Sequence, residues 1–107
     1  MLMNDYMKEA MKTRKPSADL TYAVFKLCGE AGEVAEKFGK QIRDYGGDFY
    51  EDSFKDSAIR ELGDVLWYIA AIAQDMDFTL EQVAQVNLDK LSDRSTRGVI
   101  GGSGDYR

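Results

Sequence analysis

The segment from Leu62 to Ala73, LGDVLWYIAAIA, constrains the fold of this chain more than any other part of the sequence. As a helix it is apolar on nearly every side, and a helix of that kind is buried all round. The chain has 107 residues, enough for one domain, and a four-helix monomer of this size can hardly enclose such a helix. We therefore expect a homodimer or homotetramer whose subunits share the core; the alternative is a helix that is simply central in a monomer.

Helical spacing of apolar residues continues through most of the chain, and no strand-like alternation competes with it. Pro16 ends the first segment, Gly46 ends the second, and Thr79 with Gln82 forms a capping box before the last. The four expected helices span about residues 3–14, 19–45, 53–76 and 79–95. The fold class is therefore all-α, a four-helix, bundle-like protomer in a single domain over residues 1–107, with a glycine-rich tail at 98–107.

Composition excludes several kinds of function. The chain has 19 acidic and 14 basic residues and a net charge of −5, which argues against a nucleic-acid partner. The longest apolar run is far too short to span a membrane, and we find no secretory signal. The lone Cys28 cannot form an internal disulfide, so we expect a reducing, cytoplasmic location. The chain has no histidine, which leaves carboxylates as the metal ligands and favours Mg²⁺ or Mn²⁺.

Two short acidic motifs, GEAGE and RELGD, stand in consecutive predicted helices. Glu30 and Glu33 are three residues apart, as are Glu61 and Asp64, so each pair is separated by only about 60° around its helix. Each pair can therefore present two carboxylates to one point. The embedded glycines remove side-chain bulk beside the acids, so that another backbone or a ligand can approach. We interpret the four acids as a cation site; the alternative is an ordinary solvated face rich in glutamate.

Three segments in order, GEAGEVAEK, ELGDVLWYIAAIA and NLDKLSDR, resemble the MazG-type (MazG-like) all-α nucleoside triphosphate pyrophosphohydrolases, and the RGVIGGSGDYR tail is similar to that of small members. The resemblance implies Mg²⁺-dependent cleavage of an NTP or dNTP to the monophosphate and pyrophosphate, with Mn²⁺ as an alternative ion. It implies that the metal is held by Glu30, Glu33, Glu61 and Asp64. Glu30 or Glu33 would take the proton of the attacking water.

Further candidates lie outside the acidic motifs. Asn87, Lys90 and Arg94 share one polar face of the fourth predicted helix, and they are candidates for binding substrate phosphates; the alternative is a solvated face. Trp67 is a candidate for stacking on the base, although a place in the core is the stronger interpretation. Lys37 and Lys40, a turn or two after the acids of the second helix, could also reach phosphates, although we expect them on the surface. We expect the tail to be mobile unless a ligand or a second subunit orders it.

Two other functions remain open. The family often begins its first motif with two adjacent acids, and here Gly29 precedes Glu30. This departure leaves a nucleotide-binding sensor without catalysis as one alternative. The other is a non-catalytic oligomeric helical module in which the acids are surface or interface charge.

Overall fold

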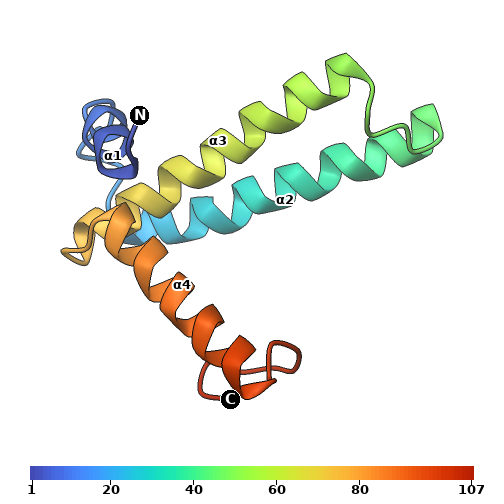
Figure 1. Ribbon diagram of the computed structural model, residues 1–107. Coiled ribbons are helices and arrows are strands. Elements are labelled where there is room, and N and C mark those ends of the chain that lie inside the picture. The colour runs from blue at the N-terminus through green and yellow to red at the C-terminus, as the bar shows by residue number, and fades with distance from the viewer.

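The computed structural model describes residues 1–107 and contains four α-helices and no strand, which confirms the all-α prediction. The helices are α1 (Met3–Met11), α2 (Leu20–Tyr45), α3 (Asp52–Asp75) and α4 (Leu80–Arg97). The long helices α2 and α3 form an antiparallel hairpin, α1 lies at its open end, and α4 leads away from it (Figure 1). None of the helices combines the length and apolarity needed to cross a membrane.

Local chemistry sets the ends of these helices much as the sequence predicts. The side chain of Asp19 accepts a hydrogen bond of 2.9 Å from the backbone N–H of Tyr22 and caps α2. Gly46 ends α2 in the left-handed region at φ 68°, where a side chain would be strained. The capping box of Thr79 and Gln82 is present at the start of α4.

Three helix ends differ from the prediction. α1 stops at Met11 because the next backbone N–H groups, of Lys12 and Thr13, bond three residues back in a turn. α3 begins at Asp52, one residue before the expected start, with Glu51 at the capping position. α4 continues to Arg97 before Gly98 turns the chain in the left-handed region at φ 74°.

The hairpin is held by two kinds of apolar contact. Near the loop, the rings of Phe38, Phe49 and Phe54 pack together with centroids 4.9 to 5.7 Å apart. Towards the open end, Ala23 on α2 and Ala70 on α3 have no exposed surface, so the helices pack through small side chains. These contacts place the middle of α2 opposite the middle of α3, where the acidic motifs lie.

The apolar segment of α3 is not buried on every side within one chain. Leu62 is 54 % exposed and Leu66 is 38 % exposed, because only α2 runs along this part of the helix. Only 8 of the 107 residues are buried, and large apolar side chains on α2, α3 and α4 face outward. The single chain therefore leaves α3 partly exposed, although the sequence predicts that this helix is buried.

The short helix α1 is attached to α3 by polar contacts that also fix the position of Trp67. The indole N–H of Trp67 donates to the carbonyl of Ala10 and the hydroxyl of Thr13, at 3.2 and 2.9 Å. About two turns further along α3, the Asp75 carboxylate receives two hydrogen bonds from the Arg14 guanidinium, at 2.9 and 2.6 Å. The indole ring is thereby held beside the acidic part of the hairpin.

Candidate metal centre

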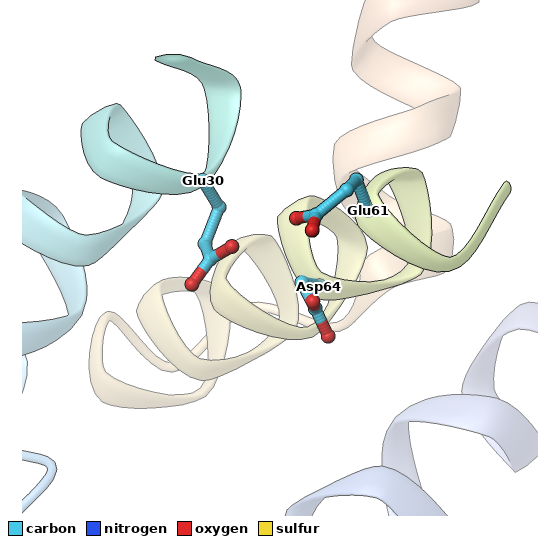
Figure 2. A group of neighbouring side chains, drawn as sticks. All are labelled: Glu30, Glu61 and Asp64. Carbon is cyan, nitrogen blue, oxygen red and sulfur yellow. The ribbon is translucent and has the colours of Figure 1, made fainter. Parts of the chain in front are cut away.

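Three acidic side chains meet between the middles of α2 and α3. Glu30 projects from α2 towards Glu61 and Asp64 on α3 (Figure 2), and one oxygen from each lies within 4.8 Å of the others. The three-residue spacing of Glu61 and Asp64 puts both on the face of α3 that looks towards α2. The structure thus brings together three of the four acids predicted from the sequence.

The group is partly withdrawn from water. The side chains of Glu30 and Glu61 are 16 % and 18 % exposed, whereas Asp64 lies at the open side of the group. One carboxylate oxygen of Glu61, Oε2, is buried and has no hydrogen-bond partner. A buried charged oxygen without a partner is costly, and this cost marks the group as a place for a cation.

Neighbouring charges compensate the acids incompletely. The Nζ of Lys26 lies 3.5 Å from Glu30 Oε1, and the Nζ of Lys37 lies 3.7 Å from Glu61 Oε1. Partial desolvation raises the pKa of Glu61; Lys37 opposes the shift, while Asp64 and Glu30 add to it. Two lysines therefore lie beside three carboxylates, so the positive charge near the group is smaller than its negative charge.

The donor set suits a hard divalent ion. All three side chains offer carboxylate oxygens, the ligands that Mg²⁺ and Mn²⁺ prefer, and the chain has no histidine to favour zinc. Acidic groups are common on protein surfaces, and the orphaned oxygen of Glu61 is what separates this group from an ordinary one. The residues present therefore fit Mg²⁺ or Mn²⁺.

Glu33 is not part of this group. Residues three apart differ by about 60° around a helix, and on α2 this rotation leaves the side chain of Glu33 exposed. The expectation that glycine beside the acids permits close approach also finds no support within the chain. A Cβ built on Gly32 or Gly63 would meet no other side chain or helix within 4 Å.

A cavity of about 290 Å³ adjoins the acidic group, lined by Glu30, Asp64, Trp67 and Tyr68. The Trp67 and Tyr68 rings meet edge to face with centroids 4.9 Å apart. Burial, with Tyr22 as the next cause, raises the pKa of Tyr68 to about 12. Trp67 is half-buried and bonded to α1, yet it also borders this cavity, so its stacking on a base stays a prediction.

The polar face of α4 lies elsewhere. α4 contacts α1 and α3 but not α2, and Lys90 and Arg94 are engaged by the tail. Lys90 Nζ lies 3.0 Å from Asp105 Oδ1, and the buried Arg94 donates to the backbone carbonyls of Gly104 and Asp105 at 3.2 and 2.9 Å. Within one chain these two cations are therefore not partners of the acidic group.

Two further predictions concern the same end of the molecule. Asn87 is exposed and borders an apolar hollow of about 600 Å³ on α4, away from the carboxylates. The tail is folded back onto α4, and the Arg107 guanidinium donates to the carbonyls of Val99 and Ile100 at 3.2 and 2.9 Å. The contacts of Arg94 with Gly104 and Asp105 join the tail to α4, and the mobility of the tail in solution stays a prediction.

Lys37 lies deeper than the surface position that we favoured for it. It is half-buried and pairs with Glu61. No spacing within α2 could reveal this, because the partner comes from α3. The Lys26–Glu30 pair carries a visible signal, a lysine four residues before a glutamate on one helix face.

The fold and the acidic group together define a class of protein, all-α chains in which two antiparallel helices present carboxylates to one point. Residues 21–99 match the family model described as the MazG nucleotide pyrophosphohydrolase domain, and the chain belongs to that family. The Gene 37 protein of Mycobacterium phage L5 is 48 % identical over 88 residues, which cover 82 % of this chain and 76 % of that relative. Its name states no activity, and no solved structure matches the chain.

Proposed function

We propose that this protein is a Mg²⁺-dependent nucleoside triphosphate pyrophosphohydrolase. It cleaves an NTP or dNTP to the monophosphate and pyrophosphate, and so removes surplus or aberrant nucleotides in the cytoplasm. The observation that supports this most directly is the group of three carboxylates around the orphaned Glu61 oxygen, in a chain of the MazG family.

The chain's own side chains have distinct parts in this reaction. Glu30, Glu61 and Asp64 would hold the ion; Glu33, the fourth acid predicted from the sequence, lies outside this group in the single chain. When bound, Mg²⁺ neutralises phosphate charge and lowers the pKa of a coordinated water. Trp67 would stack on the base at the edge of the same cavity, and Asn87, Lys90 and Arg94 remain proposed phosphate contacts.

The hydrolysis forms one bond to phosphorus and breaks one. The oxygen of water forms a bond to the α-phosphorus, the bond from that phosphorus to the bridging oxygen breaks, and pyrophosphate leaves with the electron pair. The proton of the water passes to Glu30 or Glu33. Glu30 lies in the acidic group and Glu33 is exposed one turn further along α2, so separate replacement of each by glutamine distinguishes their roles.

We also infer that the active form is a homodimer or homotetramer. Leu62 and Leu66 on α3 and Val86 on α4 are among the large apolar side chains that face outward in the single chain. Exposed apolar surface on several helices is typical of an interface. A second copy of the chain is the cover that we propose, because one chain encloses only 8 buried residues.

The test is a panel of NTPs and dNTPs assayed with Mg²⁺ and with Mn²⁺ for release of both monophosphate and pyrophosphate. Glu61→Gln is expected to lower turnover by at least about a hundredfold, whereas Glu9→Gln, an exposed change on α1, leaves it unaltered. Nucleotide binding without turnover would favour the sensor. Neither binding nor turnover, with Glu61→Gln behaving as wild type, would favour the non-catalytic module.

A further inference from the structure

A second polar cavity, of about 220 Å³, lies next to the acidic group in the direction of the hairpin loop. Its lining includes Lys37 and Lys40 from α2, and Ser53 and Ser57 from α3. Lys37 belongs to both places, because its Nζ also lies 3.7 Å from Glu61 Oε1. The cavity and the acidic group therefore share a wall.

The residues of the two places follow one another along one face of α3. Ser53, Ser57 and Glu61 are spaced by four residues, and Asp64 follows by three, so all four lie on one face of the helix. Across the hairpin, α2 runs the other way, with Glu30 opposite the acids and Lys37 opposite Ser57 and Glu61. Along the hairpin, aromatic residues are thus followed by acidic ones and then by basic and hydroxyl groups, and we call this row of residues the groove.

Lys37 has donors that nothing in the chain uses fully. Its separation from Glu61 exceeds hydrogen-bond distance, and its side chain is 32 % exposed, so the ammonium group is held at the edge of the cavity. Lys40 is more exposed and pairs with Glu36 at 3.0 Å on the outer side of α2. Lys37 is therefore the better-placed cation for a ligand in this cavity.

The one acidic side chain that lines the cavity, Glu51, already has hydrogen-bond partners within the chain. Glu51 accepts hydrogen bonds from the Ser53 hydroxyl and from the Gln41 amide, the latter at 3.1 Å. Gln41 in turn is buried and also donates to the carbonyl of Asp48 at 2.7 Å. The carboxylate of Glu51 is thus tied into the wall together with the Ser53 hydroxyl. The donors left for a ligand are the lysine ammonium groups and the hydroxyls of Ser57 and Tyr45.

We propose, on the basis of the proposed function, that this cavity receives the β- and γ-phosphates of the substrate and that Lys37 contacts them directly. The ammonium and hydroxyl groups that line this cavity suit a small polyanion better than a nucleoside. The nucleoside then lies at the opposite end of the groove, beside Trp67. This arrangement sets the direction of the substrate, with the α-phosphate next to the carboxylates.

The proposal also gives Lys37 a part in the reaction. When the bond between the α-phosphorus and the bridging oxygen breaks, the electron pair and the added negative charge stay on pyrophosphate. An ammonium group beside the leaving group stabilises this charge more in the transition state than in the bound substrate. Lys37 is therefore a catalytic residue that contacts substrate and not merely the counter-ion of Glu61.

The experiment compares two matched variants, Lys37→Met and Lys26→Met. Both remove a lysine on α2 that lies 3.5 to 3.7 Å from a carboxylate of the group, and only Lys37 borders the cavity. Binding of inorganic pyrophosphate in the presence of Mg²⁺ is measured by calorimetry, after circular dichroism has shown unchanged helix content. Lys37→Met is expected to weaken binding by about ten- to a hundredfold, and Lys26→Met to leave it near the wild-type value.

Equal weakening in both variants would overturn the proposal, since it would show only a general effect of charge. Absence of pyrophosphate binding to the wild-type protein with Mg²⁺ would overturn it as well. Nucleotide turnover, assayed in parallel, separates the proposed anion site from the proposed enzymatic function. Selective loss of pyrophosphate binding in Lys37→Met without any turnover of nucleotides in the wild type would sustain the anion site and refute the enzyme.

Discussion

At the scale of single residues, the carboxylate of Glu61 has the most consequence for stability. Its unpartnered oxygen and its acidic neighbours make the folded chain less stable than it would be with a compensating ion. We predict that Mg²⁺ raises the melting temperature of the wild-type protein. At a concentration hundredfold above its Kd, the ion adds about 2.7 kcal/mol, or about 10 °C or more for a domain of this size.

Glu61→Gln is expected to remove most of that Mg²⁺-induced rise and, without Mg²⁺, to melt at or above the wild-type temperature. The physical reason is that the amide relieves repulsion with Glu30 and Asp64 and can hydrogen-bond to them. Thermal unfolding by circular dichroism, with and without Mg²⁺, measures both effects. An equal Mg²⁺ response in the variant would show that the ion binds elsewhere.

The pair of Arg14 and Asp75 gives a prediction with a defined pH dependence. Two hydrogen bonds from Arg14 lower the pKa of Asp75 in the folded protein, so the unfolded chain binds this proton more readily. The contribution to the free energy of unfolding is therefore complete well above the ordinary aspartate pKa of about 3.9. It disappears as the pH falls through the lower folded value.

Asp75→Asn should lower the free energy of unfolding by about 1–2 kcal/mol near pH 7, measured by urea denaturation. The difference from wild type should shrink steadily below about pH 4. Asp93→Asn serves as the control, since its pair with Arg97 is solvent-exposed and such pairs contribute about 0.5 kcal/mol or less. A difference that persists unchanged in acid would mean that packing, and not the charge, is what the substitution removes.

At the scale of helices, what could be read from the sequence depended on whether the determining contacts are local. The start of α2 near Asp19, the cap at Thr79 and the stop at Gly46 depend on neighbours within a few residues, and they were predicted. The position of Glu61 and Asp64 on one face of α3 depends only on the pitch of the helix, and it too was predicted.

The parts that were missed depend on how one helix is rotated against another. Whether Glu30 or Glu33 faces α3 is decided by the packing of α2, and spacing within α2 treats the two alike. The same holds for Lys37, whose partner Glu61 is on the opposite helix. For the tail, composition did not reveal the hydrogen bonds of Arg94 to Gly104 and Asp105, which cross from helix to tail.

Those contacts lead to a prediction about α4 and its tail. One carboxylate oxygen of Asp105 pairs with both Lys90 and Arg94, and these two cations lower the pKa of Asp105. Asp105→Asn removes the charge that both cations share. We expect residues 98–107 to exchange amide hydrogen faster and to be cleaved sooner by a protease, while helix content stays the same. Identical protection in variant and wild type would show that the backbone carbonyls alone hold the tail.

At the scale of the whole molecule, the open arrangement of the chain raises the question of where the polar face of α4 acts. α4 contacts neither α2 nor the acidic group, yet Lys90 is proposed to bind substrate phosphates. The hairpin and α4 both expose apolar side chains, so a second copy of the chain could pack against either of them. We therefore predict that Lys90 of one subunit completes the carboxylate site of another, and that each site in the oligomer is shared.

Mixing two inactive variants tests this prediction directly. Glu61→Gln disables the carboxylate half of a site and Lys90→Ala the cationic half, so in a mixed dimer one site combines both defects and the other is intact. Co-refolding equal amounts should restore about a quarter of wild-type turnover if sites are shared, and none if each chain supplies its own Lys90. Because Lys90→Ala also frees Asp105, Asp105→Asn is assayed alongside. If that variant retains turnover, the loss in Lys90→Ala belongs to the missing ammonium group and not to the released tail.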